Sequence, residues 1–152
     1  MNLEKLKSEI ILEEGSVKSV YLCSANHPTF GIGHLITKND PEFGQPVGTE
    51  VSDTRVQEVF ETDISIVIKD CEMLYPQLYD LPEEVQHCIA NMCFQLGRPR
   101  LSKFKKMKKA IDDRNYELAA SEMLNSLWSK QTPNRANRLA DRMRKAYDSK
   151  ET

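Results

Sequence analysis

The sequence predicts an α+β fold in which a long helix joins a small antiparallel sheet lobe to a helical lobe. Residues 17–35 alternate in polarity around the turn SANHP, as the strands of a hairpin do, while apolar residues elsewhere recur at helical spacing. The length of 152 residues suits one domain over 1–152. We expect a β lobe at about 15–60, and a helical lobe formed by about 75–152 together with the helix at 1–14.

The ends of the expected helices have recognisable residues. Gly15 ends the first helix after Glu14, because glycine is favoured just past a helix C-terminus. Ser52 or Asp53 caps a long helix that runs to about residue 74, roughly 33 Å. Asp80 and Pro82 open another helix, which closes at Gly97. Three more helices are expected near 101–112, 115–127 and 133–148, the last with Thr132 as its cap and Pro133 in its first turn.

Charge is unevenly divided along the chain. Residues 1–100 hold 8 Lys and Arg against 16 Asp and Glu, whereas residues 101–152 hold 13 against 7. A basic segment beside an acidic one suggests an anionic polymer as partner, although solvated helix faces would produce the same pattern. The run at 103–109 is the densest part of this charge. It could attract anionic wall polymer or outer-membrane lipid, but a solvated helix face is favoured.

Cysteine and histidine are too sparse to predict a metal site. The four cysteines (Cys23, Cys71, Cys88 and Cys93) form no CxxC pair and only three histidines are present, so we expect neither a zinc site nor a disulfide framework. The N-terminal apolar stretch contains acidic residues, which argues against a secretory signal, and no run reaches transmembrane length. We therefore expect a cytosolic protein without stable membrane insertion.

Glu14 is the first candidate for chemistry. A helix C-terminus carries partial negative charge, which disfavours the carboxylate form of a group placed there. A carboxyl group that holds its proton is what a general acid needs to protonate a leaving oxygen. Most glutamates at helix ends are solvated surface groups, so this position alone is a weak indication.

The spacing of Glu14 from later residues strengthens the indication that it has a chemical role. Eight residues separate Glu14 from Cys23 and five separate Cys23 from Thr29, with Gly-Ile-Gly-His following at 31–34. This pattern resembles the phage lysozymes of the T-even and lambdoid type, a glycoside hydrolase family with the signature Glu, eight residues, Asp or Cys, five residues, Thr. Two later blocks, NMCFQLG at 91–97 and WSKQTPNRA at 128–136, are also similar to that family and follow in the same order.

The resemblance implies a lysozyme-like fold and an endolysin that hydrolyses the β-1,4 bond between N-acetylmuramic acid and N-acetylglucosamine in peptidoglycan. Glu14 would be the general acid, and Cys23 and Thr29 would hold the attacking water, with inversion at the anomeric carbon. No cofactor and no metal are implied. The expected partners are glycan strands and not nucleic acid, and we expect a monomer. The enzyme would remain in the host cytoplasm until a holin gave it access to the wall.

Further residues match family positions. The resemblance implies that Arg135 orients the catalytic glutamate. For His34 a structural role is favoured over a catalytic one, with Asp63 on the long helix as the expected carboxylate partner. Substrate-binding positions implied by the resemblance are Gly33, Leu35, Phe94 and Gln95. The match is poorer at Met107 and Glu122, where relatives carry small polar residues, so subsite preference is not carried over.

The cysteine leaves two alternatives open. At an ordinary pKa of about 8.5, only about 3% of a cysteine is thiolate at pH 7. Either nearby cations favour the thiolate of Cys23, or the thiol mainly positions water beside Thr29 while Glu14 carries more of the barrier. We favour the second alternative.

Three competing functions are weighed. A lytic transglycosylase cleaves the same bond with one catalytic acid and without water as nucleophile. A cysteine peptidase using Cys23 and His34 is disfavoured, because such a nucleophile normally sits at a helix N-terminus. A non-catalytic module would bind the cell wall or nucleic acid. The net charge of −2 and the lack of clustered aromatic residues among the lysines argue against nucleic acid.

Overall fold

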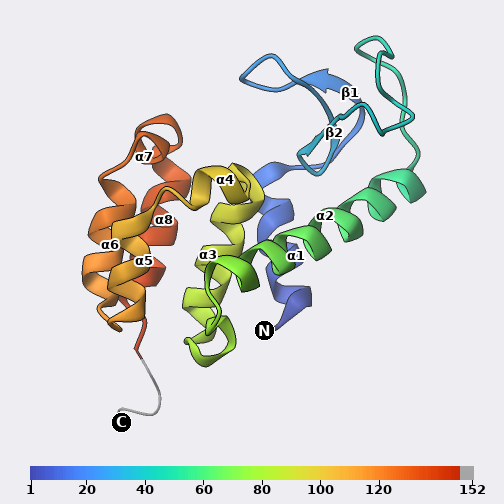
Figure 1. Cartoon of the computed structure of the whole chain (residues 1–152). Helices are drawn as coiled ribbons and strands as arrows, with labels where there is room; N and C mark the ends of the chain where they lie inside the picture. The colour runs from blue at the N-terminus through green and yellow to red at the C-terminus, as the bar shows by residue number, and fades with distance from the viewer. Residues whose placement is uncertain (148–152) are drawn as a thin grey trace. The chain divides into compact units, whose positions relative to one another are not determined.

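The computed structural model describes residues 1–147 and confirms the α+β class (Figure 1). Helices alternate with short connections, and one small sheet lies near the N-terminus of the chain. In order, the elements are α1 (Leu3–Glu14), β1 (Val17–Leu22), β2 (Pro28–Gly31), β3 (His34–Leu35), α2 (Asp53–Leu74), the 3-10 turn η1 (Leu78–Asp80), α3 (Glu83–Leu96), α4 (Arg98–Leu101), α5 (Lys105–Asp112), α6 (Tyr116–Leu124), α7 (Leu127–Gln131) and α8 (Pro133–Arg144).

The chain divides into two compact units. One, here called the sheet unit, spans Lys7–Ile66; the other, the helical unit, comprises Met1–Leu6 and the chain from Val67 onward. Both boundaries fall inside helices, in α1 and in α2. The expected helical lobe took in the whole of the first helix, whereas here most of α1 groups with the sheet. The end of α1 closes directly onto the sheet, as the contact of Glu14 described below shows.

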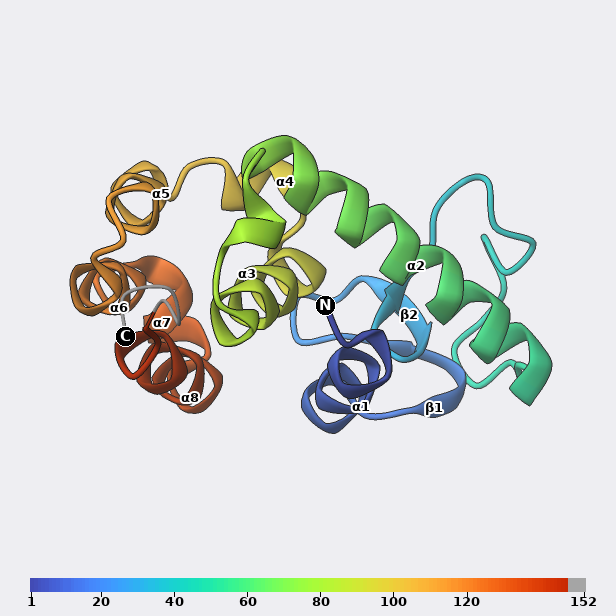
Figure 2. The same cartoon turned by 90° about the horizontal axis from the view of Figure 1, so that it is seen from below.

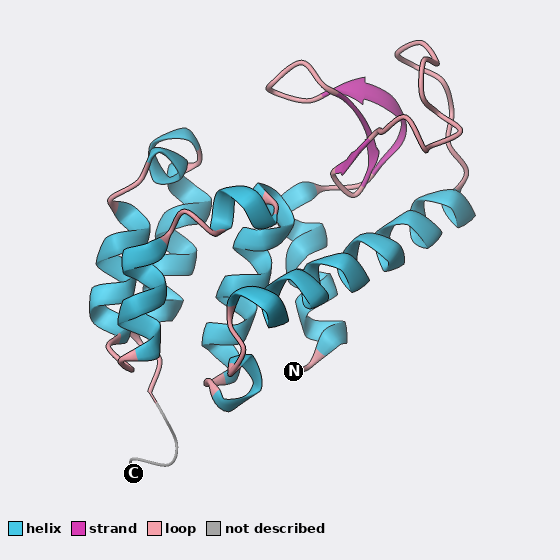
Figure 3. Ribbon diagram, in the orientation of Figure 1, coloured by secondary structure: helices cyan, strands magenta, loops and turns pink. Residues whose placement is uncertain are grey.

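The sheet unit is built on three antiparallel strands in the order β1-β2-β3 (Figure 3). The pairing of β1 with β2 is irregular between Val17 and Tyr21. Residues 48–51 run along the free edge of β1, where the Val20 amide donates to the Thr49 carbonyl and the Val51 amide donates to the Lys18 carbonyl, both at 2.9 Å. The loop between β3 and α2 thereby returns to the sheet instead of hanging free.

Helix α2 begins and packs as its sequence predicts. Ser52 is the N-cap, because its Oγ accepts a hydrogen bond from the Arg55 amide at 3.1 Å. Six apolar residues of α2 recur at helical spacing and form one stripe along the helix. Leu74 is half-buried and the other five are buried: Val56, Phe60, Ile64, Val67 and Cys71. Burial of this stripe is what holds a 22-residue helix in place, since exposed helix propensity alone is marginal.

Helix α3 is the core of the helical unit. Ten of its 14 residues are buried, and it ends as predicted at Gly97, whose φ of 80° suits glycine. Helix α8 packs on α3, while α6 packs between α5 and α8 (Figures 1 and 2). The side chains that fill this region include Ile89, Met92, Met123 and Leu139.

Between residues 97 and 133 the structure corrects the expected helices. The segment 101–112 is broken, because α4 ends at Leu101 and α5 starts only at Lys105. The helix expected at 115–127 stops at Leu124, since the Ser126 side chain accepts from the Ser129 amide at 3.2 Å and so caps a separate helix, α7. These caps compete locally with a continuous helix, which periodicity alone does not reveal.

The start and end of α8 also differ from expectation. Pro133 begins the helix and Thr132 precedes it, but the Thr132 hydroxyl caps nothing. It donates instead to the Trp128 carbonyl at 3.0 Å, in the last turn of α7. The helix ends at Arg144, and the expected end at 148 lies outside the described residues.

Candidate active site

Glu14 is fixed by a close contact with backbone. It is the last residue of α1, and the Gly15 amide closes the helix by donating to the Ile11 carbonyl at 2.8 Å. The side chain is half-buried and lies on the turn between β2 and β3. A Cβ atom at Gly33 would stand 2.7 Å from Glu14 Oε1, so any other residue at position 33 would require the Glu14 carboxylate to move. Gly33 also has a φ of +64°, which glycine adopts without strain.

The sheet brings further predicted residues onto one face. In the strand register Tyr21 lies opposite Thr29, and Thr29 lies opposite Leu35. Residues opposite each other across antiparallel strands point to the same face, and so do residues two apart on one strand. Tyr21, Thr29 and Leu35 therefore form a row across the sheet, and Cys23 follows two residues after Tyr21.

The turn after β1 positions Cys23 beside Thr29. The Cys23 amide donates to the His27 carbonyl at 3.0 Å, and the Asn26 amide donates to the Cys23 carbonyl at 2.8 Å. Asn26 adopts a φ of 63°, a conformation that asparagine tolerates better than most residues. The Thr29 hydroxyl donates to the same His27 carbonyl at 2.9 Å. The turn thus gathers the thiol and the hydroxyl at one end of the sheet.

Backbone amides act on the Cys23 thiol. Hydrogen bonding from the His27 backbone is the largest effect and lowers the pKa of Cys23, while burial opposes it and the Ala25 backbone adds to it. The Thr29 side chain also lowers this pKa. Because Thr29 has one hydroxyl proton and gives it to the His27 carbonyl, we regard the amides as the main donors to sulfur. The direction of this shift is the one required by the first alternative for Cys23, but its causes are backbone amides and not cations.

Tyr21 is a site residue that the sequence analysis missed. Burial raises the pKa of its phenol, and the negative charges of Glu14 and Cys23 raise it further. The phenol therefore lies within electrostatic range of both predicted catalytic groups. The signal was present in the sequence, because the alternating pattern of residues 17–23 puts Tyr21 and Cys23 two residues apart, the spacing of one face of a strand.

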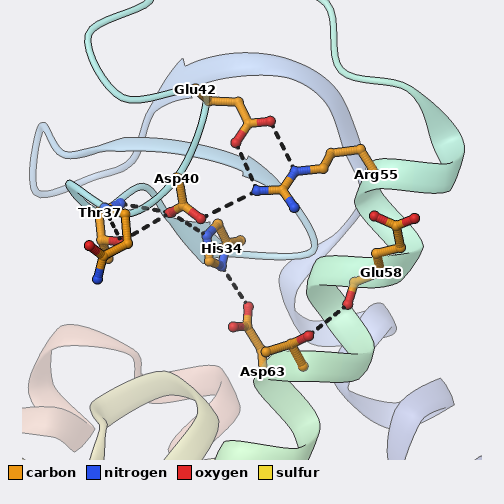
Figure 4. Close-up of polar contacts among 9 residues, drawn as sticks. His34, Thr37, Asp40, Glu42, Arg55, Glu58 and Asp63 are labelled. Atoms are coloured by element: carbon orange, nitrogen blue, oxygen red, sulfur yellow. Dashed lines mark hydrogen bonds and ion pairs between the residues drawn. The ribbon is translucent and has the colours of Figure 1, made fainter.

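His34 sits between two carboxylates, as Figure 4 shows. Its Nδ1 is 2.8 Å from Asp63 Oδ2, the expected partner, and its Nε2 is 2.9 Å from Asp40 Oδ2, which was not expected. Both ring nitrogens must donate to satisfy both acceptors, so the imidazolium form fits this site. Burial disfavours the charged ring, but the hydrogen bonds to Asp63 and Asp40 outweigh it and raise the pKa of His34.

A second clamp extends this network to the loop after β3 (Figure 4). Arg55, on α2, donates to both oxygens of Glu42 at 3.0 Å and to Asp40 Oδ1 at 3.3 Å. The guanidinium also lies 5.9 Å from the centre of the Phe30 ring, over β2. The loop that carries Asp40 and Glu42 is therefore tied both to the sheet and to α2. His34 acts in this network as a support, which agrees with the structural role favoured from sequence.

The remaining predicted residues lie in the helical unit. Gln95, on α3, accepts a hydrogen bond from Trp128 Nε1 at 2.8 Å, which fixes its side-chain amide. Phe94 beside it is half-buried. Arg135, on α8, is buried and its Nε donates to Asn91 Oδ1 at 2.8 Å. The second and third sequence blocks thus meet in space, α3 against α8.

The part of the chain that the structure describes contains neither a candidate metal site nor a candidate membrane-spanning helix. Within residues 1–147 no group of three or more His, Cys, Asp or Glu side chains is arranged to hold a metal ion. In the same range, none of the helices combines the length and the apolar character needed to cross a bilayer.

Comparison with known proteins identifies the family. Residues 12–146 match the phage lysozyme family. "Probable T4-type lysozyme 2" of Dictyostelium discoideum is 34% identical over 156 aligned positions, which cover 90% of this chain and 92% of that protein. Two phage proteins, pre-baseplate central spike protein Gp5 of Enterobacteria phage T4 and peptidoglycan hydrolase gp36 of Pseudomonas phage phiKMV, are each 29% identical, covering 84% and 78% of this chain but 25% and 13% of those proteins.

The chain belongs to the phage lysozyme family. At the level of that family it is a glycosidase of the lysozyme type, a muramidase-like cell-wall hydrolase.

We predict that the His34 network makes stability depend on pH in one direction near neutrality. Because the folded state raises the pKa of His34, its contribution is fully present below the unfolded value of about 6.5 and is lost as pH rises through the folded pKa. The free energy of unfolding in urea should therefore fall as pH increases past neutrality. His34→Gln should remove this dependence, while a His27→Gln variant at an exposed position should keep it.

We also predict that stability depends on pH in acid, through Asp40. Burial alone would raise the pKa of Asp40, but hydrogen bonds from the Thr37 amide and from His34 outweigh it and lower this pKa. Its contribution is present above the unfolded pKa and is lost as pH falls through the folded one. A wild-type free energy of unfolding that did not change with pH, either in acid or above neutrality, would contradict the proposed roles of Asp40 and His34.

We predict that Gly33→Ala inactivates the enzyme beyond its effect on stability. The added Cβ would displace the Glu14 carboxylate from its place on the turn, and a displacement of about 1 Å in a catalytic group can cost roughly 100-fold in rate. Gly48→Ala is the matched control, because Gly48 also has positive φ, +94°, but nothing lies within 4 Å of its Cβ position. Both variants should lose about 1–2 kcal/mol of unfolding free energy from backbone strain.

The measurement is the clearing rate of a peptidoglycan suspension, normalised to folded protein. Equal rates for the two variants would show that the contact with Glu14 has no part in activity.

Proposed function

We propose that this protein is an endolysin that hydrolyses the β-1,4 bond between N-acetylmuramic acid and N-acetylglucosamine, with Glu14 as general acid. The carrying observation is the close approach of the Glu14 carboxylate to Gly33, on the turn between β2 and β3, in the same sheet unit as the row of Tyr21, Thr29 and Leu35. A lone glutamate at a helix end is common. One that lies on such a turn, with its charge and that of Cys23 both acting on Tyr21, is a candidate acid.

The proposed reaction is an inverting hydrolysis. The Glu14 carboxyl gives its proton to the glycosidic oxygen as the bond to the anomeric carbon breaks. A water molecule, held by Cys23 and Thr29, attacks that carbon from the opposite face and loses a proton to the thiolate of Cys23.

Cys23 takes the place of a carboxylate in this scheme. The amides of the turn at 23–27 lower its pKa, so a larger share of thiolate is available to accept a proton from water and to oppose the developing positive charge. Thr29 is held by the His27 carbonyl, which leaves its oxygen lone pairs for the water. We therefore assign Cys23 an electrostatic part as well as the positioning part expected from sequence.

Other residues are proposed as binding or supporting groups. His34 and Asp63 support the turn that carries Gly33, and Arg135 supports the acid, as the family resemblance implies. The proposed substrate-binding residues are Gly33 and Leu35 in the sheet unit and Phe94 and Gln95 in the helical unit. Their proposal rests on the family positions, together with the exposure of Leu35 at 51% and the fixed amide of Gln95.

The proposed partner is the glycan strand of peptidoglycan. The name of the phiKMV relative, a peptidoglycan hydrolase, and the T4-type lysozyme of Dictyostelium support that substrate. We further propose a monomer that remains in the host cytoplasm and depends on a holin to reach the wall.

A lytic transglycosylase remains the second candidate, and the absence of a second carboxylate in the Glu14, Cys23, Thr29 set is the observation that favours it. Mass spectrometry of digested peptidoglycan separates the two reactions. Hydrolysis gives reducing muramic acid ends, whereas the transglycosylase gives 1,6-anhydro ends. Anhydro products would overturn the water-based mechanism and leave Glu14 as the acid.

Removal of the acid is the decisive test of the proposal. Glu14→Gln keeps the shape but has no proton to donate, so clearing of peptidoglycan should fall by a factor of roughly 100 to 10,000. Glu13→Gln, one residue earlier in α1 and also half-buried, should keep activity. An active Glu14→Gln variant would remove the general acid, and a wild type that binds peptidoglycan without releasing products would identify a binding module instead.

Cys23 should be the thiol that reagents reach in the folded protein. Cys71 and Cys88 are fully buried and Cys93 is 1% exposed, whereas Cys23 is half-buried in the turn. Because its pKa is lowered, labelling by iodoacetamide should rise with pH to a midpoint below that of free cysteine, and labelling should inhibit clearing moderately by blocking the site.

Two variants check this assignment. Cys23→Asp should keep activity, because a carboxylate about 4 Å from the developing charge contributes roughly 4 kcal/mol at an effective dielectric of about 20. This variant should also be insensitive to iodoacetamide, because it has no thiol at position 23. Cys23→Ser should ignore the reagent and lose the electrostatic part. Full activity of wild type after complete labelling of Cys23 would place this residue outside the site.

A further inference from the structure

Tyr21 carries a hydroxyl group that the proposed reaction does not use. The residue lies on β1 and is half-buried. Within residues 1–147 its hydroxyl has no hydrogen-bond partner, whereas the hydroxyl of Tyr79 donates to Glu72 Oε2 at 3.2 Å. A polar group that is partly withdrawn from water and has no partner inside the protein is available to a bound molecule.

The strand register places Tyr21 beside the residues assigned to the attacking water. Tyr21 lies opposite Thr29 on β2, so the two side chains share one face of the sheet. Cys23 follows two residues later, and its turn brings it next to Thr29. The negative charges of Glu14 and of Cys23 both act on the phenol. Tyr21 is therefore close to both groups that take part in the proposed proton transfers, and all four residues belong to the sheet unit.

The two residues assigned to the water offer it only hydrogen-bond acceptors. Thr29 gives its single hydroxyl proton to the His27 carbonyl at 2.9 Å, so only the lone pairs of its oxygen remain. The thiolate form of Cys23 has no proton to give. A water molecule between Cys23 and Thr29 therefore donates both of its protons, and neither residue contacts its lone pairs.

The lone pairs of this water decide the direction of attack. One lone pair forms the new bond to the anomeric carbon, and a hydrogen bond to the other would fix the orientation of the first. Among Tyr21, Cys23 and Thr29, the phenol is the group that has a proton to give. Burial, then the charges of Glu14 and Cys23, raise the pKa of Tyr21, so the phenol keeps its proton at neutral pH.

We propose that Tyr21 is a third residue that holds the attacking water, by donating a hydrogen bond from its hydroxyl to the water oxygen. The inference rests on the proposed hydrolysis. In that step the water oxygen bonds to the anomeric carbon as the bond to the glycosidic oxygen breaks. Glu14 gives its proton to the glycosidic oxygen, and the water gives one proton to the thiolate of Cys23. Tyr21 keeps its own proton throughout.

The test is the removal of this hydroxyl with the ring kept in place. Tyr21→Phe should lower kcat on soluble peptidoglycan fragments about tenfold, the effect of roughly one hydrogen bond. KM should change less than about twofold, because the water and not the sugar loses a contact. Tyr79→Phe is the matched control, since it removes a phenol hydroxyl in the helical unit and should keep the wild-type kcat. Both variants should keep the thermal melting of the wild type.

A double variant tests whether Tyr21 and Thr29 act on the same water. Thr29→Val removes the acceptor, so adding Tyr21→Phe should then cost much less than tenfold, because a water that has lost its site gains little from the phenol. Thr29→Ser keeps a hydroxyl at this position. In that background Tyr21→Phe should cost the full factor of about ten.

Several results would overturn the inference. A wild-type kcat for Tyr21→Phe would remove its hydroxyl from the reaction, and Glu14→Gln would still test the acid separately. A rise in KM alone would mean a contact with the sugar. Losses that multiply in the variant with Thr29→Val would mean that the two residues act on different groups. Release of 1,6-anhydro ends by the wild type would remove the attacking water and this role with it.

Discussion

The carboxylate of Glu14 rests on the backbone of Gly33, and most of the site geometry follows from that contact. A Cβ atom at position 33 would stand 2.7 Å from the carboxylate and would force it to move. The end of α1 is therefore set directly against the turn between β2 and β3. The strand register then places Thr29 and Leu35 in line with Tyr21, and the hairpin turn places Cys23 next to Thr29. A positional tolerance well under the length of a hydrogen bond is what acid catalysis requires.

The polar network behind this turn explains how a sheet of three short strands holds such a position. Small sheets are weak by themselves and need packing or tethering. His34, one residue after Gly33, is held on both sides by Asp40 and Asp63, and Arg55 ties Asp40 and Glu42 to α2. The network ties the loop after β3 to the sheet and to α2, beside the turn that carries Gly33. The imidazole of His34 and the guanidinium of Arg55 share three carboxylates, those of Asp40, Glu42 and Asp63.

The charge asymmetry of the sequence also has a structural meaning. The basic third of the chain is divided between pairs that close within α5 and four cations that line one pocket of the helical unit. These four, which form no ion pair within residues 1–147, are Arg100, Lys103, Lys105 and Lys106. A chain with net charge −2 that concentrates unpaired cations in one place presents a local positive field despite its overall sign.

Local sequence determined the fold class, the bounds of α1, α2 and α3, and the motif that leads to the phage lysozyme family. These features depend on short-range signals: Gly15 and Gly97 end helices, Ser52 begins one, and the apolar stripe of α2 has helical spacing. Periodicity failed where a side chain competes with the helix, as Ser126 does. Periodicity also gives no information on the pairing of Asp40 with His34, because Asp40 lies in a loop whose path depends on Arg55.

Tertiary structure alone decided the surroundings of the Cys23 thiol and the placement of the unpaired basic residues. The sequence names a thiol at position 23, but the amides that lower its pKa point at sulfur only because the turn closes through the His27 carbonyl. Likewise, seven consecutive positions from 103 to 109 read as one basic run. Helix geometry then turns some of those side chains toward acidic partners one turn away and leaves others around a cavity, because residues adjacent in sequence do not share a face.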